Sequence, residues 1–164
     1  FATDGILGGA RGTIPGIYAV IYTAPPALRD PLAVELARYL AAEGFGMFDE
    51  TGAAGDIYVD HMPDTVDSGI CVYSSGGAPP DVATSIGRPV LQIIVRGNRN
   101  AHTSCLKAQS ILTALHGLHD LTLTTGGTRV MLIAARQSEP IPLGRDEHGR
   151  HQYSINFQLI TGGN

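Results

Sequence analysis

Two short apolar runs, with a Gly/Pro segment between them and a long amphipathic stretch after them, constrain the fold of this chain most. Residues 70–73 and 89–96 are rich in β-branched and aliphatic side chains, and residues 74–80 read Ser-Ser-Gly-Gly-Ala-Pro-Pro. Gly and Pro favour turns and weaken strands, so the intervening residues predict a Ser/Gly turn. Apolar residues at helical spacing then predict a helix over residues 101–116.

The second of the two strands has an informative pattern of side chains. Leu91, Ile93 and Val95 fall on one face, and the alternate residues on the other face are also mostly apolar. A strand with two apolar faces is typical of a central position in a sheet. The pattern therefore predicts that this strand is covered on both sides.

A first helix is predicted over residues 31–43. Asp30 is suited to cap its N-terminus, Pro31 suits the first helical position, and Gly44 can end the helix in a left-handed conformation. Further strands are predicted at residues 57–59, 121–123, 130–135 and 153–159, with a tight turn at residues 126–127 and a charged hairpin tip at residues 144–150.

Strands that follow one another through hairpins indicate an α+β fold, in which two main helices pack on a largely antiparallel sheet. Residues 28–164 should form this single domain. Residues 1–27 should form an extended N-terminal arm, which is either flexible or wraps around another subunit. Within the arm, residues 17–23 could be a strand of the domain or could pair with a neighbouring subunit.

Composition narrows the function. Only 16% of the 164 residues are charged, against about 25% in an average protein. Such a surface suits either an assembly or a monomer rich in Gly and Ala. The net charge is −4 and no basic run occurs, so tight nucleic-acid binding is not expected. No secretion signal or membrane-spanning stretch is visible, and a soluble protein made in the cytoplasm is expected.

No combination of residues forms a convincing catalytic or metal site. The pairs His116/His119 and His148/His151 lack further ligands at workable spacing. Four aspartates between residues 56 and 67 lack the pattern of a calcium loop, and Cys105, beside His102, has the spacing of a core residue. Cys71 and Cys105 are expected to be free thiols. The sequence therefore predicts no catalytic residues, cofactors or bound metal.

Several segments together resemble a known family. They are the helix at residues 31–43, the Met-Pro-Asp turn at residues 62–64, the strand that ends in Tyr-Ser-Ser-Gly-Gly-Ala-Pro-Pro at residues 73–80, and the Arg-Pro-Val-Leu-Gln-Ile-Ile-Val-Arg-Gly segment at residues 88–97. Over residues 28–161 the chain resembles the tail terminator or minor capsid (head-tail joining) proteins of long-tailed bacteriophages.

The resemblance implies a structural virion protein that forms a six-fold ring. Such a ring caps the tail tube, meets the connector or stopper protein on the head side, and leaves a channel through which DNA passes without specific binding. It implies no catalytic residue and no membrane. The arm is longer than the family pattern, which leaves open a special attachment role or another neck position.

Charged residues near strand ends and at the hairpin tip are the candidate contacts between subunits or with a neighbouring ring. They are Arg88, Arg96, Arg99, Arg145, Asp146, Glu147 and Arg150. Each could equally be an ordinary solvated charge. The alternatives to a ring protein are another neck or head-completion protein, a small enzyme that uses Cys105 with His102 or a metal bound by aspartates, and a monomeric ligand-binding module.

Overall fold

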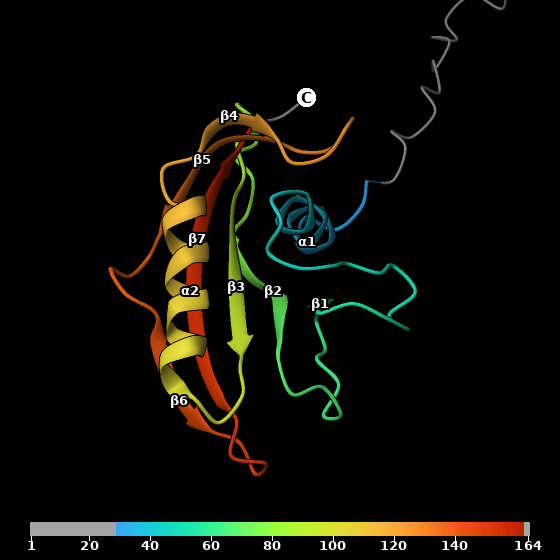
Figure 1. Cartoon of the computed structure of the whole chain (residues 1–164). Helices are drawn as coiled ribbons and strands as arrows, with labels where there is room; N and C mark the ends of the chain where they lie inside the picture. Colours follow the sequence, from blue (N-terminus) through green and yellow to red (C-terminus); the bar gives the residue numbers. More distant parts are fainter. Residues whose placement is uncertain (1–28, 163–164) are drawn as a thin grey trace, which may run out of the picture.

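The computed structural model describes residues 29–162 and shows two helices packed on a curled, mostly antiparallel sheet of seven strands (Figure 1). The elements in chain order are α1 (Leu32–Ala42), β1 (Ile57–Val59), β2 (Gly69–Ala78), β3 (Arg88–Arg96), α2 (Ala101–Leu115), β4 (His119–Thr122), β5 (Arg129–Ala135), β6 (Ile141–Arg145) and β7 (His151–Thr161). The predicted α+β fold is confirmed. The predicted arm lies outside the described residues.

The order of strands across the sheet is β1-β2-β3-β7-β5-β4, and only the β1–β2 pair is parallel. β7 organises the sheet because one edge pairs with β3 along most of its length. Its other edge is shared, since residues 151–154 pair with β6 and residues 157–161 pair with β5. β6 was not predicted from the sequence, because Pro142 and Gly144 interrupt any alternating pattern.

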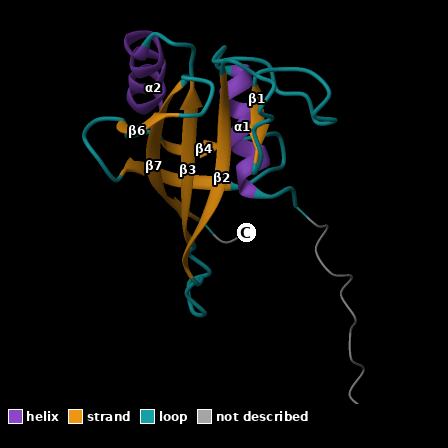
Figure 2. Ribbon diagram, turned by 90° about the horizontal axis from the view of Figure 1, so that it is seen from below, coloured by secondary structure: helices purple, strands orange, loops and turns teal. Residues whose placement is uncertain are grey.

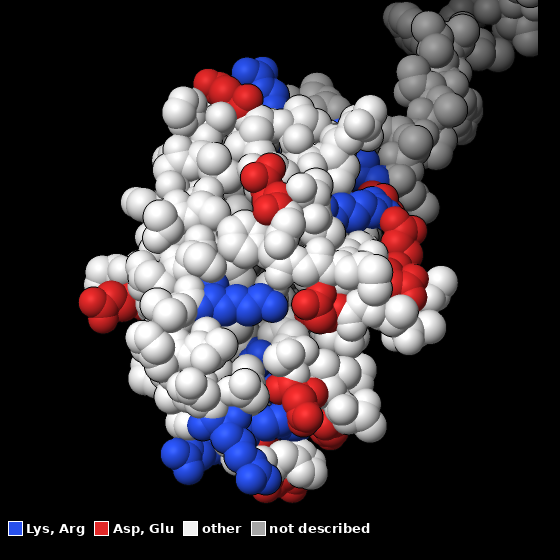
Figure 3. All heavy atoms as spheres, viewed as in Figure 1, with Lys and Arg blue, Asp and Glu red and all other residues white. Residues whose placement is uncertain are grey.

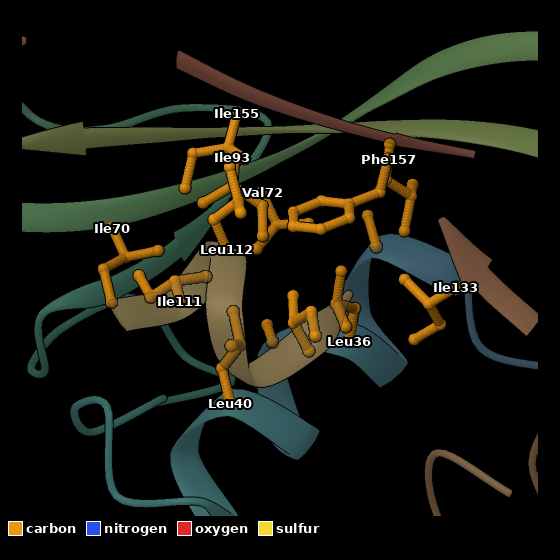
Figure 4. Close-up of a cluster of buried hydrophobic side chains, with 14 of the residues drawn as sticks. Leu36, Leu40, Ile70, Val72, Ile93, Ile111, Leu112, Ile133, Ile155 and Phe157 are labelled. Atoms are coloured by element: carbon orange, nitrogen blue, oxygen red, sulfur yellow. The ribbon is translucent and has the colours of Figure 1, made fainter. Parts of the chain in front are cut away.

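Both helices cover the same face of the sheet, as Figure 2 shows. Leu36 and Leu40 of α1, Ile111 of α2 and Phe157 of β7 belong to one cluster of buried apolar side chains, which fills the space between the helices and the sheet (Figure 4). These side chains are at most 1% exposed. Burial of each contributes roughly 1.5–3 kcal/mol, so this single apolar cluster supplies most of the stabilisation of the domain.

The ends of α1 differ partly from the expectation. Gly44 has φ of +82° and ends the helix as predicted. Asp30 does not cap, which corrects the prediction, because Pro31 occupies the N-cap position and no side chain bonds there. The Asp30 carboxylate instead accepts a hydrogen bond from Arg38 Nη1 at 2.6 Å, eight residues further along the chain. The carboxylate therefore pairs with Arg38 and leaves the N–H groups at the start of the helix without a side-chain cap.

The predicted turn at Ser74–Gly77 is wrong, because these residues continue β2 to Ala78. The strand tolerates them because its pairing with β3 shifts register between Ser74 and Gly77, and Gly76 and Gly77 take φ of +78° and +133°. Only glycine adopts such angles readily. The turn itself lies further out, at residues 79–87.

The expectation that β3 is covered on both sides is also wrong. Leu91, Ile93 and Val95 are fully buried beneath the helices, but Val90, Gln92 and Ile94 on the opposite face are half-buried. A small cluster of Tyr58, Met62 and Cys71 covers part of that face at the β2 side. The second face of the sheet is therefore largely open, apolar or amide-bearing, and uncharged along the middle of β3.

Candidate assembly surfaces

The histidine, cysteine and aspartate side chains that could serve catalysis or metal binding lie apart from one another. Among residues 29–162, no three His, Cys, Asp or Glu side chains come together to hold a metal ion. His116 has a structural contact, because the N–H of Ala135 lies 3.1 Å from its Nδ1 and ties α2 to β5. His151 Nε2 lies 3.0 Å from Arg145 Nε. The geometry thus favours structural positions for these imidazoles.

Both cysteines are free thiols. Cys71 is fully buried, and burial raises the pKa of its thiol. A thiol with a raised pKa in an apolar setting is a poor nucleophile. Cys105 is half-buried on α2, and no hydrogen bond joins it to His102, which is exposed. No thiol in residues 29–162 is therefore paired with a general base.

The most developed polar site is a corner built around Arg150, at the start of β7. Its guanidinium is almost fully buried and makes three close hydrogen bonds. Nε donates to Asp146 Oδ2 at 2.7 Å, and Nη1 donates to the carbonyl oxygens of Asp64 at 2.6 Å and Val66 at 2.9 Å. Arg150 thus fastens the loop before β2 to the β6–β7 hairpin.

Arg96, at the end of β3, joins the same corner. Its Nη1 donates to the carbonyl oxygen of Pro63 at 2.8 Å and lies 3.4 Å from that of Val66. Its Nε is buried and has no hydrogen-bond partner, since the Asp146 carboxylate is 3.8 Å away. Arg96 and Arg150 are therefore both used within the protomer, where they hold residues 63–66 in place.

The Asp146 carboxylate is the anion on which this corner depends. Partial burial opposes its ionisation, but the N–H of Arg150, its guanidinium and the N–H of His148 outweigh that effect and lower the pKa to about 2. Asp146 is consequently charged at neutral pH and stabilises the hairpin tip by accepting hydrogen bonds from it.

Other charged groups of the corner point outward. The side chains of Asp64, Asp67 and Glu147 are 79%, 90% and 82% exposed. Together with Arg99 and the amides of residues 98 and 100, they line a polar hollow of about 910 Å³. Figure 3 shows basic and acidic groups gathered at this end of the molecule, while most of the same face is uncharged.

The seven predicted contact residues thus occupy three different settings. Asp146, Arg96 and Arg150 form the interior of the corner, and Arg99, Arg145 and Glu147 lie exposed around it. Arg88 is exposed at the opposite end of β3. Sequence reasoning missed the loop at residues 63–66, because it contributes backbone carbonyl oxygens, which leave no trace in the choice of residue.

A second protruding feature is the outer part of the β2–β3 hairpin. Residues 74–85 are exposed, and Val82 at the tip is fully exposed. Asp81 organises the tip locally, because its carboxylate accepts hydrogen bonds from the N–H groups of Ala83 and Thr84 at 2.8 and 3.0 Å. No described side chain fastens this tip to the body of the domain.

Comparisons with known proteins agree with this picture. One solved structure, described as the virion of a native gene transfer agent particle, has a similar fold, with a TM-score of 0.59 and 15% sequence identity over 80% of this chain and 95% of that chain. No curated protein matches the chain. Neither described helix has the length and continuous apolar sequence that a membrane crossing requires.

A family model assigns the chain more directly. The model for the bacteriophage tail terminator protein matches residues 39–161, from the middle of α1 to the end of β7. This match covers the end of α1, all of α2, the whole sheet and both protruding hairpins, and it confirms the resemblance found in the sequence. The chain belongs to the bacteriophage tail terminator family and is a structural protein of the virion tail.

Proposed function

We propose that this tail protein forms a ring of six copies that ends the tail tube and joins it to the connector or stopper protein on the head side. The ring assembles in the cytoplasm of the host and leaves a channel through which DNA passes. The family match over residues 39–161 is the observation that carries this proposal. The protein acts by shape and association, without catalysis, cofactor or metal.

The surface of the protomer supports self-association. A closed ring needs two different patches on each copy that fit each other, repeated around an axis. The open face of the sheet and the exposed hairpin at residues 74–85 carry few charges, so little charge has to be desolvated when copies meet. The charged corner offers a distinct surface for a neighbouring ring of tube or connector protein.

Charge also suits a DNA channel. The chain carries a net charge of −4, and repulsion from phosphates keeps DNA from adhering to an acidic ring. Arg96 and Arg150 of the corner are engaged by carbonyl oxygens and Asp146, and the exposed Arg99 lines the same hollow as the carboxylates of Asp64, Asp67 and Glu147. DNA is therefore expected to pass without specific binding.

Another neck or head-completion position is the alternative. The chain is longer than the similar virion chain, since 80% of it accounts for 95% of that chain, and the additional residues could serve attachment at such a position. Labelling the protein in intact particles separates the two positions. Label at the head-proximal end of the tube supports the tail terminator, whereas label within the head-side connector supports the alternative.

Native mass spectrometry tests the ring directly. Six copies of 17.2 kDa give about 103 kDa, and this species is expected either alone or on addition of the tail tube protein. A protein that stays monomeric under both conditions, at high concentration, contradicts the proposal.

Charge reversal at the corner tests its role in joining. The double variant Arg145→Glu with Glu147→Lys changes two exposed side chains and leaves Arg150 intact, so the domain should fold. We expect rings to form but tube or connector binding to fall. Removing residues 145–150 as a block is a poorer test, because the deletion also removes the buried Arg150.

A further inference from the structure

The outer edge of β2 is unpaired where β1 stops. The N–H of Ile70 donates to the carbonyl oxygen of Asp56 at 2.8 Å, and the carbonyl oxygen of Val72 accepts from the N–H of Asp60 at 3.0 Å. The backbone groups of residues 70 and 72 therefore face outward, that is, away from β3 and toward the edge of β2 at which β1 pairs. Asp60 then takes φ of +60° and turns the chain away. Because backbone groups alternate along a strand, those of Ser74 also face outward, and none of the described residues bonds them.

The other exposed edges are less suited to accept a strand. His151 uses its backbone groups toward β3, so Tyr153, two residues later, also faces β3. Pro142 lies opposite Tyr153, and its nitrogen therefore faces the free side of β6, where it cannot donate a hydrogen bond. β4 is short and carries Asp120 at φ of +50°, paired with Arg129. Proline, charge and distortion are features that protect an edge from pairing.

Residues 74–78 of β2, in contrast, are Ser-Ser-Gly-Gly-Ala. They carry no charge and no bulky side chain, so another backbone can approach closely. All of them are exposed. The register shift between Ser74 and Gly77 and the positive φ of Gly76 and Gly77 distort the outer part of this edge. Its regular part is therefore restricted to the residues around Ser74, and an added strand would be short.

The sequence before Arg29 supplies a segment of the right kind. Residues 17–23 read Ile-Tyr-Ala-Val-Ile-Tyr-Thr, and β-branched and aromatic residues favour strands. Eight residues separate this segment from α1 and span at most about 29 Å when extended. α1 packs on β1 and β2, the strands that border the free edge. Pro25 and Pro26 favour an extended connection between the two.

We propose that residues 17–23 of one copy add as a strand to the edge of β2 at Ser74–Ala78 of a neighbouring copy. The proposal rests on the proposed ring, since it needs a neighbour of the same kind. Each copy then donates a strand on one side and accepts one on the other, which is the heterologous contact that closes a ring. Main-chain hydrogen bonds supply the affinity in strand addition.

Disulfide trapping in assembled particles tests the contact. The test chains carry Cys105→Ser and Ser74→Cys together with Ala19→Cys, Val20→Cys or Ile21→Cys, so that three consecutive registers are sampled. Adjacent strands bring Cα atoms within the 4.4–6.8 Å that a disulfide requires. At least one variant should give, after mild oxidation, a ladder of covalent multimers on a non-reducing gel, with the peptides that contain residues 20 and 74 linked.

Matched variants control for chance collision. Moving the acceptor cysteine from Ser74 to Ala83, which is equally exposed at the hairpin tip, should abolish the ladder. Cross-linked monomers in place of a ladder would show pairing within one chain and overturn the proposal, as would the absence of any disulfide in particles that contain complete rings. In that last outcome the ring function stands. If particles contain no ring of this protein, the proposed function itself fails.

Discussion

Two hairpins protrude from this domain, and they are held in opposite ways. The β6–β7 tip is fastened by Arg150, whose buried guanidinium bonds Asp146 on its own hairpin and carbonyl oxygens on a loop more than eighty residues away. The outer β2–β3 hairpin has only local contacts around Asp81. Buried charge therefore fixes the β6–β7 tip in a single geometry. The outer β2–β3 hairpin is left exposed, with Asp81 as its one charged side chain, and is free to be covered by another chain.

The β4–β5 hairpin is also fastened to the body of the domain, by one buried carboxylate. Glu35 of α1 is 1% exposed, and its carboxylate accepts hydrogen bonds from Thr128 N at 2.7 Å and Thr128 Oγ1 at 3.1 Å. One buried side chain again fastens a hairpin to the body of the domain. The cost of removing each fastening can thus be ranked.

The largest effect is expected for Arg150→Ala. The change leaves Asp146 and the carbonyl oxygens of Asp64 and Val66 without their partner, and the loss of a buried charge-assisted network should lower the free energy of unfolding by about 3 kcal/mol. Urea unfolding followed by circular dichroism measures it. Arg99→Ala, on an exposed side chain of the same corner, should change stability by less than about 0.5 kcal/mol. Equal effects of the two variants would contradict the role of Arg150.

Glu35→Ala should come next, at about 2 kcal/mol, because the N–H of Thr128 loses its acceptor. Glu35→Gln keeps an acceptor oxygen in the same place and should cost less. The comparison of the two urea midpoints reports the hydrogen bond separately from the volume of the side chain. A glutamine variant as unstable as the alanine variant would show that charge, and not hydrogen-bond acceptance, holds this hairpin.

Acid should weaken the β6–β7 corner selectively. The pKa of Asp146 is lowered to about 2 in the folded protein, against about 3.9 in an unfolded chain. Its stabilising contribution is therefore complete above pH 4 and is lost as the pH falls from 4 through 2. The difference in urea midpoint between the wild-type protein and Asp146→Asn should narrow over this range. A difference that stays constant would contradict the assignment.

The smallest effect on stability is expected at the outer β2–β3 hairpin. Replacing the exposed residues 80–85 by Asn-Gly, which favours a tight turn, should change the free energy of unfolding by less than about 0.5 kcal/mol, because these residues lie away from the core and the hydrogen bonds of Gly87 to Thr161 are kept. Ring assembly should nevertheless suffer. Thermal unfolding and native mass spectrometry of the same sample distinguish the two effects, and a large loss of stability with normal assembly would reverse our interpretation of this hairpin.

The sequence predicted the parts of the fold that depend on side-chain pattern. Both helices, the strand at residues 57–59 and the core strands β3, β5 and β7 were found from apolar periodicity, and Gly44 marked the end of α1. The extension of β2 through Ser74–Ala78 was missed because local propensity disfavours these residues, and pairing with β3 overrides it.

The corner was only half predictable for a related reason. Charged residues at residues 145–150 marked a surface tip, but nothing in their spacing distinguishes Arg150, which is buried, from Arg145, which is exposed. The distinction arises from carbonyl oxygens of residues 63–66 that the fold brings alongside. Long-range backbone contacts of this kind cannot be inferred from one sequence.

The central claim is that copies of this chain surround the end of a tail tube, and imaging of the intact particle by electron cryomicroscopy tests it most directly. Our account predicts a closed ring of six copies between the last layer of the tube and the head-side connector, with the charged corners directed at a neighbouring ring. A single copy, or copies without like neighbours at that position, would contradict it.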